Sequence, residues 1–388
     1  MTMTRTFHPV GQGLYCTERF VDDDDLKVNV VYDCGSDSLR YADLEEVIHA
    51  SFGNGDEIDA VFISHFDSDH VKGLPILLNW CKVKKVFLPI VSSKAEVAYL
   101  RFKSLVELDK KNGYYIPVAD RLLDPKRTSP EKVFEGFKSL HIPEIERIDE
   151  VTSELSETSA NSTDDFGLSL WVFNMYNFKR FDRESDFRDI LNEALLSQKI
   201  SVSLDDFIED AGKVIQRLDE KQANQLLRAI NKIIRGRLSK KEFRDRFGTI
   251  NGNSMTLYSG PKDTDANSSF AMRCFVDDVE HKPGCLYLGD YEAKDEIAYR
   301  RMKSFYSKGG CWSRMGCVQL PHHGSKHNYN KDFDSEGICY VVSFGLGNRN
   351  HHPGKDVITN LLKNGRSVIF STEANRYVHK NEIVQQVC

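Results

Sequence analysis

Strand-like and helix-like hydrophobic patterns alternate along the first 90 residues of the chain. Residues 58–64 form a largely apolar run, which is typical of a strand buried on both faces. Apolar positions at helical spacing over residues 40–52 and 71–80 predict a helix on either side of this run, and a short strand is expected over residues 85–88. Residues 5–35 predict two more strands. Alternation of this kind indicates an α/β layer.

The middle of the chain changes character. Residues 93–112 and 131–140 have helical spacing, whereas residues 141–165 hold eight acidic residues against one Arg and predict an exposed linker. A strong β-type run over residues 168–175 follows. Residues 178–247 contain no Pro and are rich in Leu, Ile, Lys, Arg and Glu, which predicts several helices.

β-type runs return in the last third of the chain. They cover residues 254–258, 285–288, 317–320, 340–344 and 367–370, with a helix expected over residues 355–363. We therefore expect one domain built from residues 1–177 and 249–388, interrupted by a helical insertion over residues 178–248.

Composition is typical of a soluble globular protein. The 388 residues are 40% hydrophobic and 28% charged, and no apolar run approaches the roughly 20 residues of a membrane span. The nine cysteines form no C-x-x-C pair, and the start of the chain has no signal pattern, so we expect a reduced cytoplasmic protein without a membrane association. Because the net charge is −6, any binding of nucleic acid must rely on a local basic surface.

The strongest chemical signal directly follows the buried apolar run. His65, Asp67, Asp69 and His70 place four metal-binding side chains within six residues, where the chain leaves the sheet. A strand end followed by a tight loop can direct His65 and Asp67 at one point and Asp69 and His70 at a neighbouring one. The alternative, a polar loop that caps the next helix, accounts less well for so dense a set of ligands.

Three later strand ends carry further candidates. Asp290 follows a strand and could bridge two cations, although strand–Gly–Asp turns are common for structural reasons. The segments at residues 322–325 and 348–353 each hold two adjacent histidines directly after a strand. Imidazole is a common metal ligand, and its charged form can act as an acid.

Together these motifs resemble the metallo-β-lactamase superfamily in its phosphodiesterase and nuclease branch, and most closely the soluble domain of ComEC-type DNA-uptake proteins. The resemblance covers residues 7–90 and 250–373. It rests on seven ordered segments: Val10-Gly-Gln-Gly13, Tyr32-Asp-Cys-Gly35, His65 to His70, Asn253-Ser254, Leu288-Gly-Asp290, His322-His-Gly-Ser325 and Asn348 to Pro353.

The resemblance implies an αββα sandwich with a metal site at one edge. It implies hydrolysis of a phosphodiester by a hydroxide that two metal ions activate. His65 and Asp67 would hold one ion, with a third ligand from His322 or His352.

The same resemblance implies the remaining roles at the site. Asp69 and His70 would hold the second ion, and Asp290 would bridge the two. Asp33 would orient a ligand histidine. Asp69, His323 and His352 are the candidate catalytic residues, with His323 or His352 as proton donor, and Gly324 and Ser325 are candidates for binding the phosphate.

The sequence departs from the superfamily's commonest motif, H-x-H-x-D-H. Asp67 replaces the second His, and the usual ligand histidine in the middle of the chain is missing. Exchange of an imidazole for a carboxylate hardens the site, which favours Mn²⁺ or Mg²⁺, with Zn²⁺ still possible.

The insertion carries a basic segment. Residues 221–247 hold nine Lys and Arg against two acidic residues, and apolar positions recur at helical spacing. Such a helix could present cations, among them Lys232 and Arg235, to a nucleic-acid backbone or to a protein partner. A merely solvated charged face is the alternative interpretation.

Three functions follow from these observations. We expect a metal-dependent DNase, for which a role as a defence or mobile-element effector is one context. The alternatives are a hydrolase of a cyclic nucleotide, nucleotide or ester at the same dinuclear site, and a non-catalytic binding module on this fold.

Overall fold

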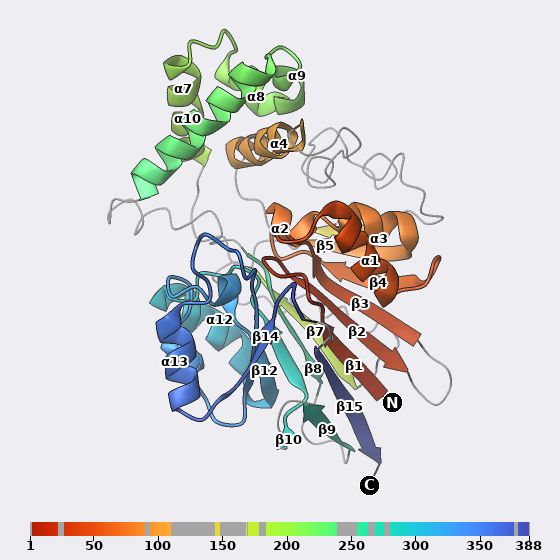
Figure 1. Cartoon of the computed structure of the whole chain (residues 1–388). Helices are drawn as coiled ribbons and strands as arrows, with labels where there is room; N and C mark the ends of the chain where they lie inside the picture. Colours follow the sequence, from red (N-terminus) through yellow and green to blue (C-terminus); the bar gives the residue numbers. More distant parts are fainter. Residues whose placement is uncertain are drawn as a thin grey trace. The chain divides into compact units, whose positions relative to one another are not determined.

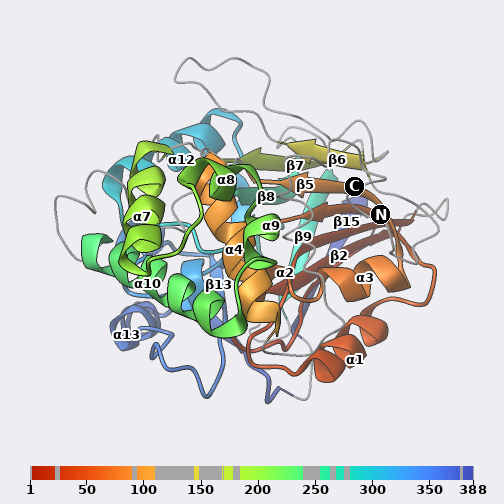
Figure 2. The same cartoon turned by 90° about the horizontal axis from the view of Figure 1, so that it is seen from above.

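The computed structural model of the chain forms two compact units (Figures 1 and 2). We call Met1–Pro89, Phe137–Phe178 and Ser254–Cys388 the sandwich unit, and Ile90–Gly136 with Lys179–Asn253 the helical unit. The described residues are 2–21, 27–89, 94–109, 144–147, 168, 170–177, 184–238, 254–262, 268–274, 280–375 and 379–387.

The sandwich unit contains two mixed sheets. The first has nine strands in the order β10-β9-β15-β1-β2-β3-β4-β5-β6, in which β3 to β6 run parallel. Its strands are β1 (Thr2–Phe7), β2 (Tyr15–Val21), β3 (Lys27–Cys34), β4 (Glu57–Phe62), β5 (Lys82–Leu88), β6 (Glu144–Arg147), β9 (Ser268–Cys274), β10 (Glu280–His281) and β15 (His379–Val387).

The second sheet has six strands in the order β14-β13-β12-β11-β8-β7, in which β11 to β14 run parallel. Its strands are β7 (Trp171–Tyr176), β8 (Thr256–Pro261), β11 (Gly284–Tyr287), β12 (Met315–Gln319), β13 (Cys339–Ser343) and β14 (Ser367–Ser371).

Buried side chains from both sheets form one core between them, with Phe62 of β4, Phe173 of β7 and Tyr287 of β11 among its members. On the outer face of the first sheet lie α1 (Tyr41–Ser51) and α3 (Leu74–Trp80), which contacts β3 and β5. α12 (Glu296–Lys308) and α13 (Lys355–Lys363) pack on the outer face of the second sheet. This four-layer order of helices, sheet, sheet and helices confirms the predicted αββα class.

The strand β4 shows why the local prediction succeeded. Five of its six residues are buried, because it pairs with β3 on one side and β5 on the other and has a layer on each face. A strand in that position needs a largely apolar sequence, and its one buried charge, Asp59, is paired with Lys84 at 2.8 Å.

Three expectations need correction. The first 35 residues form three strands, since β1 precedes the pair β2 and β3. Within the stretch expected to be a linker, β6 extends the first sheet by parallel pairing with β5, while most of that stretch lies outside the described residues. The helix α12 and the strands β9 and β15 were not predicted.

The helical unit has its own apolar core. It contains α4 (Lys94–Asp109), α7 (Glu184–Ser197), α8 (Leu204–Glu209), α9 (Ala211–Ile215) and α10 (Glu220–Leu238). α4 packs with the insertion helices, although it precedes the predicted start of the insertion by many residues. The boundaries of the two domains stay a prediction.

Two general expectations can be compared with the described residues. Seven cysteines there are buried and free of disulfides. Among the helices of the described part, none is long and apolar enough to cross a membrane.

Candidate metal centre

The carboxyl ends of parallel strands from both sheets carry the candidate residues. Asp33 lies in β3, and His65 follows β4 in the first sheet. Asp290, His323 and His352 follow β11, β12 and β13 of the second sheet. Loops at such strand ends are a common position for ligand sites in α/β proteins.

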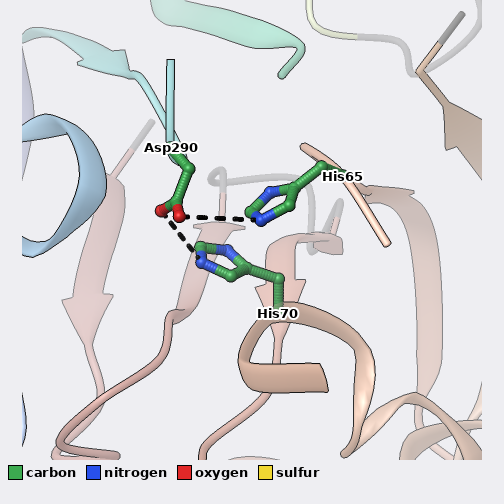
Figure 3. A group of neighbouring side chains, drawn as sticks. All are labelled: His65, His70 and Asp290. Atoms are coloured by element: carbon green, nitrogen blue, oxygen red, sulfur yellow. Dashed lines mark ion pairs between the residues drawn. The ribbon is translucent and has the colours of Figure 1, made fainter. Parts of the chain in front are cut away.

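One group of possible ligands combines His65, His70 and Asp290 (Figure 3). Nε2 of His65 lies 3.7 Å from Oδ2 of Asp290, and Nε2 of His70 lies 3.2 Å from Oδ1 of the same carboxylate. The two oxygens of Asp290 therefore face different histidines, as a bridging carboxylate requires.

A second group combines Asp69, His70 and His323. Oδ2 of Asp69 lies 3.1 Å from Nε2 of His323 and 3.9 Å from Nε2 of His70. Oδ1 of Asp290 lies 3.9 Å from Nε2 of His323, so this carboxylate reaches both groups. His70 is common to the two groups, and within each group the ligand atoms lie within 4.8 Å of one another.

Asp33 fixes the orientation of His70 from behind. Its Oδ2 lies 2.7 Å from Nδ1 of His70 and accepts the hydroxyl of Ser64, while its Oδ1 accepts the Ser64 amide. A carboxylate can only accept, so Nδ1 carries a proton and Nε2 is directed at the two ligand groups. Asp33 has a φ of 53° and is fully buried. The predicted contact with a ligand histidine is present.

Gln319 supports the turn that carries Asp290, and sequence reasoning missed it. Its buried Oε1 accepts the amides of Leu288 and Gly289 at 2.8 and 2.9 Å. Gly289 has a φ of 51°, and a Cβ built on it would lie 2.5 Å from Cβ of Ser64. A glycine is needed here because the turn crosses directly over the end of β4. A single Gln at the end of an apolar strand gives no signal of this contact.

The histidine pair after β12 occupies left-handed backbone. His322 and His323 have φ values of 47° and 55°, which turn the two rings in different directions. Nδ1 of His323 lies 2.9 Å from the carbonyl oxygen of Ser343, so its Nε2 faces Asp69. Nδ1 of His322 lies 3.6 Å from Oδ2 of Asp290, on the side that faces His65.

His352 lies beside this pair, with its ring centroid 5.2 Å from that of His322. Asn348 braces the loop: its Oδ1 accepts the His352 amide, and its Nδ2 donates to the His352 carbonyl, both at 2.8 Å. Burial and the neighbouring imidazoles of His322 and His323 lower the pKa of His352 to about 4. This ring is neutral at neutral pH.

The carboxylates of the cluster favour their charged form. Burial opposes ionisation of Asp290, but the nearby imidazoles, chiefly that of His322, outweigh burial and hold its pKa well below the ordinary value. Burial also opposes ionisation of Asp69, yet His70 and the hydrogen bond from His323 lower its pKa. The site therefore combines buried negative charge with imidazole nitrogens.

The donor set fits a divalent cation. Nε2 of His65 and Nε2 of His70 are buried and form no hydrogen bond within the described structure. A buried nitrogen without a partner is costly, and a metal ion would satisfy it. Carboxylate oxygens and imidazole nitrogens at these separations are the usual ligands of Mn²⁺, Mg²⁺ and Zn²⁺.

Residues 21–143, which include β3, β4 and the His65–His70 segment, match the sequence model of the metallo-beta-lactamase superfamily. The chain has the metallo-β-lactamase fold. Among solved structures, the chain is similar to the crystal structure of a long form RNase Z from yeast, with 10% sequence identity and a TM-score of 0.34. That match covers 90% of this chain and 38% of the yeast chain. Among curated proteins, no sequence matches.

The structure brings most of the predicted ligands together. Asp67 and His322 lie outside the two three-residue groups, but each lies beside a member. Oδ2 of Asp67 is 3.8 Å from Nε2 of His65, and Nδ1 of His322 is 3.6 Å from Oδ2 of Asp290. His323, considered from the sequence as a proton donor, lies with Asp69 and His70 instead. Which of the histidines bind metal stays a prediction.

The predicted phosphate-binding residues also make contacts within the loop itself, and their role toward a phosphate stays a prediction. The Ser325 hydroxyl is buried and accepts the His327 amide, and the Ser325 amide donates to the His322 carbonyl. The Gly324 carbonyl accepts the amide of Gly354. These contacts give both residues a role in holding the histidine loop.

The predicted DNA-binding residues lie apart in sequence, on α10. Lys232 is exposed there, and the side chain of Arg235 is outside the described part.

Proposed function

We propose that the chain is a metal-dependent phosphodiesterase that cleaves DNA. The observation that carries this proposal is the pair of ligand groups around Asp290, with two buried histidine nitrogens that form no hydrogen bond within the described residues.

The geometry supports two adjacent cation positions. Oδ2 of Asp290 faces His65 and His322, with Asp67 beside His65, and these residues would hold the first ion. Oδ1 of Asp290 faces His70 and His323.

The second ion would lie on that other side of Asp290, held by Asp69, His70 and His323. With three carboxylates in the combined set, Mn²⁺ or Mg²⁺ is favoured and Zn²⁺ is the alternative.

Two divalent cations supply activation of water and stabilisation of negative charge on a phosphoryl group. The residues of the chain do the rest. Asp33 and Ser343 fix which nitrogen of His70 and His323 faces the cluster. His352, held by Asn348 at the edge of the cluster, would donate a hydrogen bond from its neutral ring to the oxygen of the leaving group.

DNA is proposed as the substrate for two reasons. The ordered motifs resemble the nuclease domain of ComEC-type proteins. In addition, the chain has a net charge of −6 yet carries five basic residues against one acidic residue over α10. A local basic face of that kind is expected of a protein that binds a phosphate backbone.

The test uses protein stripped of metal and then supplied with Mn²⁺, Mg²⁺ or Zn²⁺. Single-stranded, linear duplex and circular duplex DNA are incubated beside bis-p-nitrophenyl phosphate, with Asp69→Ala as the blank. Metal-dependent cleavage of DNA that Asp69→Ala lacks is the expected result. Turnover of the small ester alone would replace DNA by a nucleotide-sized substrate, and no turnover of any phosphoester by metal-loaded protein would contradict the proposal.

A further inference from the structure

A groove runs along the surface of the helical unit between α7 and α10. Its volume is about 800 Å³, and all of its lining residues belong to these two helices or directly follow α7. It lies wholly within one unit, so its description depends on no other part of the chain.

The polar groups of the groove suit a phosphate backbone. Arg228 and Lys232 lie one helical turn apart on the exposed side of α10 and line the groove. In the described part of the chain, neither cation has an ion-pair partner. The lining also includes the amide side chains of Gln198 and Gln225, and Glu193 is its one carboxylate.

Part of the groove lining is apolar and aliphatic. Ala229 and Ile233 form this part, and the lining contains no aromatic ring. Proteins that bind single strands by stacking present aromatic side chains to the bases. Contacts here would therefore go to sugars and phosphates and would depend little on base sequence.

Gly236 keeps one end of the groove open. It lies inside α10, where glycine destabilises a helix by about 1 kcal/mol relative to alanine. A Cβ built on it would meet no described atom within 4 Å, and its backbone needs no positive φ. Among the described residues, neither packing nor backbone conformation requires a glycine here, and an open groove would account for it.

We propose that this groove binds the sugar–phosphate backbone of single-stranded DNA. The inference deepens the proposed function, because the bound strand would be the substrate. The axes of packed helices lie about 8–10 Å apart, so a groove between α7 and α10 is too narrow to enclose a duplex. One strand fits such a groove, with phosphates at Arg228 and Lys232 and sugars over Ile233.

The experiment measures binding of a fluorescent 12-nucleotide strand to the full chain by anisotropy. EDTA is present throughout, so metal-dependent cleavage does not contribute. The test variant is Arg228→Gln with Lys232→Gln, and the matched control is Lys213→Gln with Lys221→Gln, which removes the same charge from exposed positions of the unit outside the groove.

Loss of two phosphate contacts should reduce the slope of log K against log salt by about 1.4 for a single strand. The control pair should leave the slope close to that of the wild type. Equal effects of both pairs would show unspecific attraction by net charge and would overturn the inference.

A second variant tests the shape of the groove without changing its charge and without destabilising the fold. Gly236→Leu fills the groove and should raise the melting temperature, because it removes a helix-destabilising glycine. It should nevertheless weaken binding of the strand, while Gly236→Ala keeps most of the affinity. Unchanged affinity of Gly236→Leu would overturn the inference.

The remaining outcomes distinguish this inference from the proposed function. A duplex that binds as tightly as the strand or more tightly would overturn the inference. So would poly-glutamate that competes as effectively as the unlabelled strand, because the groove would then prefer another ligand. If the wild type cleaves DNA with metal but the groove variants bind the strand normally, the groove inference is overturned and the proposed function is kept. If the strand binds in the groove but no metal-loaded protein cleaves DNA, the proposed function is overturned and the groove inference is kept.

Discussion

At the scale of single residues, the most informative position is Asp33. It joins the end of β4 to His70 through three contacts, and its positive φ is one that asparagine tolerates but most residues do not. Asp33→Asn therefore changes the charge behind His70 with little change of backbone strain.

We expect Asp33→Asn to weaken metal binding by about 10- to 100-fold, the usual effect of losing a partner that orients a ligand histidine. Calorimetric titration of the metal-free protein with Mn²⁺ measures this, and circular dichroism checks that the fold is kept. An affinity equal to that of the wild type would remove Asp33 from the site.

Gly289 allows a second test at this scale. Alanine at Gly289 is strained by the positive φ and also clashes with Ser64. Alanine at Gly337 is strained by the positive φ only, since no described atom lies within 4 Å of its Cβ position. Both variants should lose about 1–2 kcal/mol of stability from the backbone. Only Gly289→Ala should also lose Mn²⁺ affinity, because the clash moves the turn that carries Asp290. Equal Mn²⁺ affinity of the two variants would contradict the role given to this turn.

At the scale of elements, α10 is an amphipathic helix whose two faces differ in burial and charge. Ile230 is fully buried in the core of the helical unit, while Lys221, Arg228 and Lys232 are exposed on the other side. The apolar spacing of this helix was visible in the sequence because core and solvent each require their own residue types.

Ile230→Ala should destabilise the helical unit by about 2–5 kcal/mol, the range for truncating a buried aliphatic side chain. Hydrogen exchange followed by mass spectrometry should show faster exchange in α4, α7 and α10. Leu196→Ala is the control, since Leu196 lies in the same unit but is 70% exposed. We expect these helices to exchange more slowly in Leu196→Ala than in Ile230→Ala. The reverse order would contradict the packing of Ile230 in the core of the helical unit.

The elements also show where sequence reasoning ends. The His65–His70 segment could be predicted as a site because its ligands are close in sequence and follow a recognisable buried strand. The pairing of β15 with β1 joins the two ends of the chain, and the clamp of Gln319 on Leu288 joins different strands. Contacts of that kind depend on the complete fold, and no local pattern signals them.

At the scale of the whole sandwich unit, a buried ion pair within the first sheet is hydrogen-bonded to residues of the second sheet. Arg5 of β1 is fully buried and donates to Glu18 of β2 at 2.7 Å and to the hydroxyl of Tyr287 of β11 at 3.1 Å. Ser259 of β8 also donates to Glu18. The hydrogen bonds that Tyr287 and Ser259 make with this pair can form only when the two sheets are packed together.

Glu18→Gln leaves the Arg5 guanidinium buried without its counter-charge, which should cost about 3–5 kcal/mol. Glu57→Gln makes the same exchange in an exposed pair with Lys84 and should cost about 0–1 kcal/mol. Urea denaturation of both variants compares the two values. A similar midpoint for both would mean that the pair does not stabilise the packing of the sheets.

The most direct test of the metal centre is the number of Mn²⁺ ions bound by each chain, measured by equilibrium dialysis and elemental analysis. We predict two ions for the wild type and for His49→Ala, whose histidine lies on α1 outside the ligand groups. Asp290→Asn should lose at least one, because the bridging carboxylate faces both positions. A wild type that binds no more Mn²⁺ than Asp290→Asn would contradict a two-metal centre at this edge of the sandwich.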